Sequence, residues 1–151
     1  MKTFSYERRL HWSECDPAGI IFFPHYARWM VEGLNFLFLS IGVDPNGRID
    51  KETVAGIPSV GFSISFHQPP RLHEIVTHEI TIEKIGRSSL TVNHRFLRED
   101  ICLAEAKETR VWAAHSLADA GVKSVPIPDE VRRQLEDGGE QAPPVGSKRL
   151  L

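Results

Sequence analysis

The segment from Pro24 to about Ile41 constrains the fold more than any other part of this sequence, because it is apolar on most sides of a helix. Its apolar residues recur at helical spacing and extend beyond a single stripe: Tyr26, Trp29, Met30, Val31, Leu34, Phe36, Leu37, Phe38, Leu39 and Ile41. A helix that is apolar on most sides has to be buried on most sides. The segment therefore predicts a long central helix wrapped by a curved sheet, and Gly42 and Pro45 predict its end.

Strand patterns lie on both sides of this helix in the sequence. Before it, alternate apolar positions predict one strand, with Arg8 breaking the set: Phe4, Tyr6, Leu10 and Trp12. After it comes a polar, irregular stretch, 44–56, in which one helical turn is expected. Four strand-like segments then follow with short breaks between them, so they are expected to be antiparallel neighbours: 58–68, 73–85, 88–98 and 101–115.

The element order defines the fold class and the domain organisation. A turn is expected at 119–121 and a short helix at 128–137. One strand, one long helix and a run of antiparallel strands predict an α+β fold with one sheet around one helix. We expect a single domain over residues 1–137 and a disordered tail over 138–151, which is polar and rich in Gly and Pro until its last two residues.

Composition excludes several classes of function. The formal net charge of −2 gives no reason to expect nucleic acid as a partner. No apolar run approaches the ~20 residues of a membrane span, and the N-terminal residues lack the apolar stretch of a signal peptide. The two cysteines, Cys15 and Cys102, are too few for a disulfide framework, although they could still pair. We therefore expect a cytoplasmic protein.

The most informative acid is Asp16, which is followed at once by Pro17, Ala18 and Gly19. This order predicts a tight turn, after which the apolar run can start a helix. One interpretation is that Asp16 caps this helix. The other is that it attacks a carbonyl, or activates a water that does, while nearby backbone N–H groups hold the oxyanion.

The residues from Asp16 to Tyr26 read D-P-A-G-I-I-F-F-P-H-Y, and Trp29 follows. This run closely resembles the signature of the hydroxybenzoyl-coenzyme A thioesterase family, and the resemblance extends more loosely to about Ala114. It implies the hotdog fold, hydrolysis of an acyl-coenzyme A thioester with no cofactor, and a homodimer or homotetramer. The benzoyl-type branch of the family implies an aromatic acyl group.

The resemblance also assigns residues to the reaction. It implies that Asp16 is the nucleophile or general base and that the main-chain N–H of Phe23 is the oxyanion donor. Gly19 lies where the acyl chain or thioester passes close to the backbone. Ser59 matches a position at which a Ser or Thr hydroxyl lies near the reacting centre, although a strand-end hydroxyl is the plain alternative.

Further residues are assigned to substrate binding. Tyr26 closes the signature, and Arg87, Ser88 and Ser89 resemble the family's phosphate-contacting turn, in which a Lys stands where this chain has Ser88. Val31 stands where the hydroxybenzoyl enzyme carries an Asp for the ring hydroxyl, so recognition of a para-hydroxyl group is not expected. Glu32, the next residue, is expected to be a structural or interface acid.

The sequence leaves three other interpretations to consider. A metal site is not expected, because His73, Glu74 and His78 do not have the spacing of a zinc helix and fall on a predicted strand. A hotdog hydratase or dehydratase would need a His and an acid across the acyl tunnel, and folding could bring in His25 or His67. In a non-catalytic acyl-coenzyme A binding module, Asp16 would only cap the helix.

Overall fold

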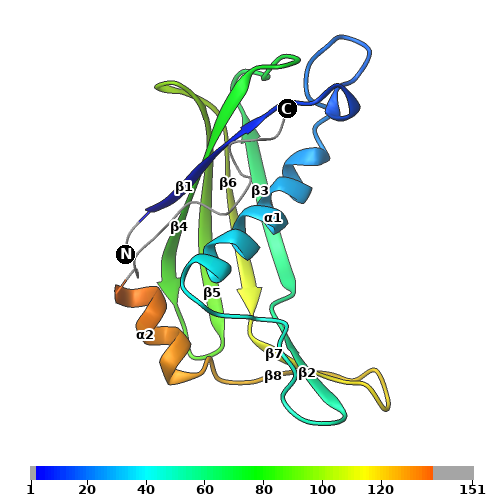
Figure 1. Ribbon diagram of the computed structural model, residues 1–151, viewed down its shortest axis with the longest axis vertical. Coiled ribbons are helices and arrows are strands. Elements are labelled where there is room, and N and C mark those ends of the chain that lie inside the picture. The colour runs from blue at the N-terminus through cyan, green and yellow to red at the C-terminus, as the bar shows by residue number, and fades with distance from the viewer. Residues whose placement is uncertain (1–2, 138–151) are drawn as a thin grey trace.

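The computed structural model describes residues 3–137, in which helix α1 (His25–Ser40) lies across a twisted five-stranded sheet (Figure 1). All neighbouring strands are antiparallel, in the order β1-β4-β5-β6-β3. Their bounds are β1 (Thr3–Arg9), β3 (Ser59–Phe66), β4 (Ile75–Ile85), β5 (Ser89–Arg98) and β6 (Ile101–Val111). The predicted α+β class, with an antiparallel sheet and one long helix, is confirmed.

Helix α1 packs on the sheet through one face, which carries the buried residues Tyr26, Trp29, Met30, Gly33, Leu34, Leu37 and Phe38. Gly33 allows a close approach to the sheet, because a Cβ there would lie 2.5 Å from His78 Cε1. The opposite face is open, with Val31 45% and Leu39 66% exposed. The prediction that the helix is buried on most sides is therefore wrong for the single chain, because the sheet covers only one of its faces.

The first strand differs from its sequence pattern at both charged and aromatic positions. Phe4 and Tyr6 are buried as predicted, but Arg8 continues the buried alternation because two carboxylates, Glu14 and Glu32, pair with it. Trp12 is 79% exposed because the chain leaves the strand and forms a 3-10 turn, η1 (Trp12–Glu14).

A second, smaller sheet was missed by the sequence patterns. It has the order β2-β7-β8, with β2 (Thr53–Gly56), β7 (Ala113–Ser116) and β8 (Val122–Ser124). A helical turn was expected in the stretch that contains β2. The long strand predicted to end at His115 is divided at Trp112 into β6 and β7, since Trp112 packs in the core.

The turn at 119–121 and helix α2 (Asp129–Asp137) lie where they were predicted. The strand predicted from residue 73 begins at Ile75 instead, because His73 has a φ of 69° in the preceding turn. The predicted disordered tail lies outside the described residues, and the domain bounds stay a prediction.

Strand β3 is an open edge of the main sheet. It pairs with β6 on one side only, and three of its apolar side chains are more than half exposed: Val60 at 63%, Phe62 at 57% and Phe66 at 55%. An edge strand of this kind presents unpaired N–H and C=O groups together with apolar surface. Such an edge is a template for pairing with another strand.

Two further sequence expectations meet the structure here. Cys15 and Cys102 are both free thiols, so they do not pair. Within residues 3–137, neither helix has the length and apolar character needed to cross a membrane.

Candidate active site

The Asp16 loop is a short reversal of the chain between η1 and helix α1. Asp16 N–H donates to Ile20 O at 2.9 Å, and Cys15 forms a bridge with Ile21. Gly19 closes the turn with a φ of 77°, and its N–H donates to Asp16 O at 3.0 Å. The turn predicted from this sequence is therefore present, and it requires a residue that tolerates a left-handed conformation.

The carboxylate of Asp16 is fixed by its own loop and not by the helix. Its Oδ1 accepts a hydrogen bond from Ala18 N–H at 2.8 Å. The N-cap position of α1 belongs to Pro24, so Asp16 does not cap this helix. The capping interpretation is wrong because a bridged segment, Ile20–Ile21, separates the loop from the helix.

Asp16 lies at the wall of an apolar cavity of about 400 Å³, whose lining includes Ile21, Phe23, Tyr26, Phe66 and His67. Among the hydrogen bonds of residues 3–137, none uses the Phe23 N–H. The lining therefore brings together an acidic residue, a residue with an unused backbone donor, and aromatic walls. Such a set can attack or hydrate a carbonyl and hold the negative charge that forms on its oxygen.

Tyr26 and Gly19 take different places around this cavity. Tyr26 is buried, with its ring 5.7 Å from that of Phe66 and 4.8 Å from that of Phe96. Gly19 lies on the other side of Asp16, beside a second hollow of about 430 Å³ that also exposes Trp12. A Cβ at Gly19 would meet no protein atom within 4 Å, so within this chain the glycine is required by its backbone conformation. Its place beside the passing acyl chain or thioester stays a prediction.

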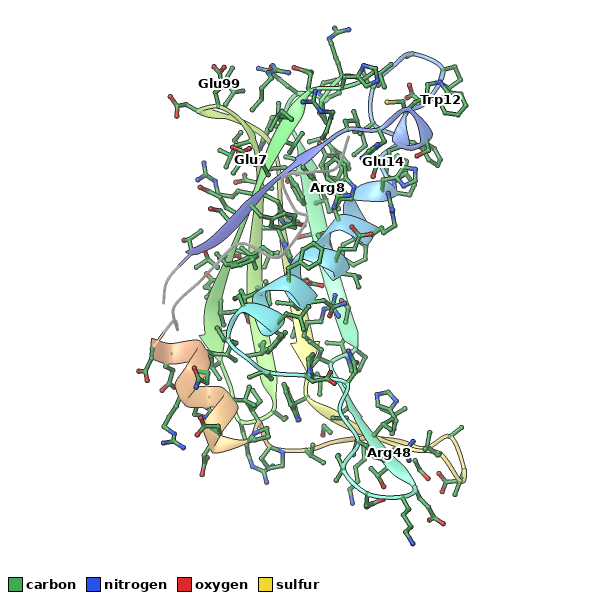
Figure 2. The ribbon with its side chains drawn as sticks, in the orientation of Figure 1. Glu7, Arg8, Trp12, Glu14, Arg48 and Glu99 are labelled. Atoms are coloured by element: carbon green, nitrogen blue, oxygen red, sulfur yellow. The ribbon has the colours of Figure 1, made fainter. Side chains whose placement is uncertain are left out.

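Sequence reasoning missed the anchor of this loop, the buried carboxylate of Glu14. It accepts hydrogen bonds from Trp29 Nε1 at 2.6 Å, from His11 N–H at 3.0 Å and from the Arg28 guanidinium. Arg8 NH2 lies 3.6 Å from the same carboxylate (Figure 2). Burial alone would raise the pKa of Glu14, but these donors and cations outweigh burial and hold it below its ordinary value.

Glu32 belongs to the same ion-pair group. It pairs with Arg8 at 2.9 Å and with Arg28 at 3.4 Å, one helical turn earlier. It is a structural acid of the helix, as expected, and it is not part of the lining of the Asp16 cavity.

The remaining predicted residues lie at the opposite end of the sheet (Figure 1). Ser59 pairs with Arg110 at the start of β3, whereas Phe66, beside the Asp16 cavity, pairs with Ala104 at the end of β3. The hydroxyl of Ser59 donates to Glu108 Oε2 at 3.3 Å. A single chain therefore does not bring Ser59 to Asp16.

The predicted phosphate turn joins β4 to β5 at this same end. Its main-chain carbonyls are occupied, since Trp112 N–H donates to Ser88 O at 2.7 Å and Ile127 N–H donates to Arg87 O at 2.9 Å. Gly86 N–H donates to Ser89 O at 2.8 Å and closes the turn. The Arg87 side chain is exposed and has no ion-pair or hydrogen-bond partner among residues 3–137, so its guanidinium can pair with an anion.

Val31 lines a smaller hollow, about 280 Å³, between the helix and the second sheet. Its other walls include Asn35, Ile57, Arg110 and His115. Val31, which was predicted to lie in the substrate pocket, therefore does line a hollow. Within one chain this hollow is next to Ser59, which pairs with Arg110, and Val31 does not line the Asp16 cavity.

Two details bear on the other interpretations. His67 lines the Asp16 cavity, so a histidine for the hydratase interpretation is brought in by folding. One group of possible metal ligands occurs within residues 3–137: His67, Cys102 and Glu105 each offer an atom within 4.8 Å of the others. Spacing in the sequence did not reveal this group. Two of its members are exposed, and His67 Nε2 lies 3.4 Å from Glu105 Oε1.

Comparison with known proteins identifies the family. The sequence model of the thioesterase-like superfamily matches residues 10–135. The 4-hydroxybenzoyl-CoA thioesterase of Pseudomonas sp. (strain CBS-3) is 29% identical over 118 residues, which cover 74% of this chain and 84% of that protein. A 1,4-dihydroxy-2-naphthoyl-CoA hydrolase of Prochlorococcus marinus (strain MIT 9515) is 28% identical over 135 residues, covering 86% and 87%.

Solved structures agree in fold. A gentisyl-coenzyme A thioesterase superposes with a TM-score of 0.72 at 29% identity, covering 87% of this chain and 98% of that chain. A 4-hydroxybenzoyl-CoA thioesterase variant in complex with 4-hydroxybenzoyl-CoA has a TM-score of 0.78 at 23% identity, covering 88% and 98%. The sheet and its helix are thus those of a hotdog-fold thioester hydrolase. The chain belongs to the thioesterase-like superfamily.

Proposed function

We propose that this protein is an acyl-coenzyme A thioesterase that hydrolyses aromatic acyl-coenzyme A esters, with Asp16 as nucleophile or general base. The observation that carries this proposal is the apolar cavity lined by both Asp16 and Phe23, whose N–H is unused within residues 3–137. The carboxylate supplies the attack, and the backbone N–H stabilises the oxyanion. This chemistry requires no cofactor.

The acyl group is aromatic on two grounds. Phe22, Phe23, Tyr26 and Phe66 line the cavity, and aromatic walls favour a flat apolar group through offset or edge-to-face contacts. Relatives and structural neighbours are named for hydroxybenzoyl, gentisyl and dihydroxynaphthoyl esters. Val31 offers no carboxylate, so a para-hydroxyl group is not selected by that position.

A complete site requires two chains, paired through the open edge of β3. When identical strands pair antiparallel about a two-fold axis between Phe62 and Ser63, Ser59 of one chain lies opposite Phe66 of the other. Phe66 lines the Asp16 cavity. The pairing therefore joins Asp16 of one chain to Ser59 and Val31 of its partner, and it also covers the exposed apolar side chains of β3.

Coenzyme A is held through its phosphates by the turn at Arg87, Ser88 and Ser89. Support comes from the exposed Arg87 guanidinium, which can pair with a phosphate, and from a turn fixed by hydrogen bonds of its own backbone. Two-fold pairing brings this end of one chain toward the Asp16 end of the other.

The assignment of the chain as one cytoplasmic domain over 1–137 is part of the same proposal. Its support is that the family match spans 10–135 and that both thiols are free. The assembly is a dimer or a pair of dimers, which light scattering on a sizing column would distinguish by mass.

Thioester hydrolysis, measured as free thiol release, tests the proposal across acetyl, medium-chain, benzoyl, phenylacetyl and hydroxybenzoyl coenzyme A. We expect aromatic esters to be turned over fastest and Asp16→Asn to abolish turnover while the esters still bind. Unchanged turnover in Asp16→Asn would overturn the role of Asp16. If the wild type bound these esters without hydrolysing them, the protein would be a non-catalytic acyl-coenzyme A binding module.

A hydratase is the second candidate, and the position of His67 in the Asp16 cavity favours it. A crotonyl-coenzyme A hydration assay, followed by loss of enoyl absorbance, separates the two functions. Hydration that depends on both His67 and Asp16, without thiol release, would replace the thioesterase proposal.

A further inference from the structure

A chain of buried polar side chains crosses the middle of the main sheet under helix α1. Tyr6 Oη lies 3.0 Å from His78 Nδ1, and His78 Nε2 lies 2.8 Å from His94 Nδ1. His94 Nε2 lies 2.9 Å from Glu108 Oε1. Both histidines are fully buried, and Gly33 of the helix leaves the space that His78 fills.

Glu108 is the last member of this hydrogen-bonded series of side chains, and its buried carboxylate accepts from three donors. Its Oε2 accepts from Arg110 Nε at 3.0 Å and from the Ser59 hydroxyl at 3.3 Å, while His94 lies at its Oε1. Burial alone would raise the pKa of Glu108, but His94 and Arg110 outweigh burial and hold it below its ordinary value. The carboxylate is therefore an anion that only accepts hydrogen bonds.

Anionic Glu108 at one end and the Tyr6 hydroxyl at the other determine the directions of the hydrogen bonds between these side chains. His94 Nε2–H must donate to Glu108, and within residues 3–137 the Tyr6 hydroxyl has one hydrogen-bond acceptor, His78 Nδ1. His78 Nε2–H then donates to His94 Nδ1. Each donor in this series therefore points toward Glu108, which accepts from His94.

Glu108 also constrains the Ser59 hydroxyl, at the outer end of this series of side chains. The Ser59 hydroxyl gives its only proton to Glu108, so its oxygen presents lone pairs to the surroundings. Arg110 also fixes the position of the segment that leads into β3, because its Nη1 donates to Ile57 O at 2.9 Å, two residues before Ser59. Ser59 is thus held as a hydrogen-bond acceptor beside the hollow that Val31 and Arg110 line.

We propose that Glu108 is a positioning residue that orients the Ser59 hydroxyl to accept a hydrogen bond from the attacking water. This inference rests on the proposed function and on the pairing that brings Ser59 to Asp16 of the partner. One water proton points to Ser59, and the other passes to Asp16 as the water oxygen bonds to the thioester carbon. The C–S bond then breaks, and the leaving sulfur takes that proton from Asp16. Ser59 therefore does not donate to the oxyanion.

Steady-state kinetics of Ser59→Ala, Glu108→Gln and the double variant test this assignment with the best aromatic ester. An amide has one acceptor oxygen and cannot serve His94, Arg110 and Ser59 together. We expect each single variant to lower kcat by about ten- to a hundredfold with KM nearly unchanged. The double variant should be no slower than Ser59→Ala, and Ser59→Thr should restore kcat.

The controls separate this inference from the proposed function. Glu83→Gln removes an exposed carboxylate that pairs with Lys107 on the same sheet, and it should leave kcat unchanged. Full kcat in Ser59→Ala, in an enzyme that Asp16→Asn inactivates, would overturn the inference and leave the proposed function intact. Multiplicative losses in the double variant would also overturn it, because they would show that Glu108 acts independently of Ser59. Ser59 is at the exposed start of a strand, so its variants test the inference even if Glu108→Gln does not fold.

Discussion

Glu14 Oε2 accepts a hydrogen bond from Trp29 Nε1 at 2.6 Å, and this contact ties the turn before Asp16 to the second turn of helix α1. Both side chains are buried, and Arg8 stacks on the Trp29 ring with its guanidinium carbon 4.3 Å from the ring centre. The main chain of Glu14 also accepts from Phe22 N–H at 2.8 Å. Glu14 therefore anchors the loop that carries Asp16 at both of its ends.

Glu14→Gln should lower both stability and turnover. The change keeps the side-chain volume but leaves Arg8 buried beside a neutral amide, which costs about 2 to 4 kcal/mol of the free energy of unfolding. Denaturant unfolding would measure this loss. Glu7→Gln on the same edge of the fold is the matched control, because Glu7 is exposed (Figure 2), and it should change the free energy of unfolding by less than about 0.5 kcal/mol.

Stability should fall with acid in two separate ranges. Burial, followed by the neighbouring His94 and Arg8, holds the pKa of His78 well below 6.5, so the folded protein keeps His78 neutral. Below about pH 6.5 the unfolded chain binds a proton that the folded chain does not, and stability decreases as the pH falls. Glu14 and Glu108 have lowered pKa values, so their contribution is lost only below about pH 4.5.

Thermal unfolding between pH 4 and 8 would measure this profile. His78 contributes to the loss of stability between pH 6.5 and 4.5, so His78→Gln should make the profile less steep there while leaving the steeper loss at lower pH. A wild-type unfolding temperature that stays constant from pH 7 to 5 would contradict the assignment of a neutral buried His78.

Asp16→Asn should remove activity without loss of stability. The Asn side chain keeps an oxygen that can accept from Ala18 N–H, so the loop is preserved while the carboxylate charge proposed to drive the reaction is lost. We expect turnover to fall by at least about a hundredfold and the unfolding midpoint to remain that of the wild type. A parallel loss of stability would indicate that Asp16 has a structural role, and thiol release with calorimetry on the same samples would distinguish the two.

Periodicity and turn chemistry were sufficient to predict most of the fold. The helical spacing from Tyr26 to Phe38 located α1, and the strand patterns located β4 and β5 to within two residues at each end. Sequence patterns cannot show which charged residues are buried, because burial of Arg8 and Glu14 depends on their finding each other across the fold. Arg8 therefore looked like a break in a strand that it continues.

The sequence does contain an indication that His78 and His94 are buried. His78 stands between Val76 and Ile80, and the inner face of β4 carries all three at a period of two. His94 has the same relation to its neighbours on β5. Polar residues at buried positions of adjacent strands indicate a hydrogen-bonded network within the sheet.

The candidate site was predicted in part. Residues that are close in sequence, Asp16 to Tyr26, do share one cavity. Ser59 and Arg87 were predicted to act in the same reaction as Asp16, yet within one chain they lie at the other end of the sheet. Sequence motifs could not show this, because a motif contains no distances between segments. The open edge of β3 indicates how two chains would complete the site, and no single-chain pattern shows this.

Mixing the Asp16→Asn and Ser59→Ala variants should raise activity above that of either variant alone if the site is shared between chains. In a dimer of Asp16→Asn with Ser59→Ala, one site carries both substitutions and the other carries neither. After denaturation and refolding of an equal mixture, half of the dimers are mixed and each has one intact site, so we expect about a quarter of wild-type turnover. Thiol release would measure it, with each variant refolded alone as the control. No recovery, in mixtures that mass measurement shows to be dimeric, would mean that Asp16 and Ser59 act within one chain or that Ser59 is not part of the site.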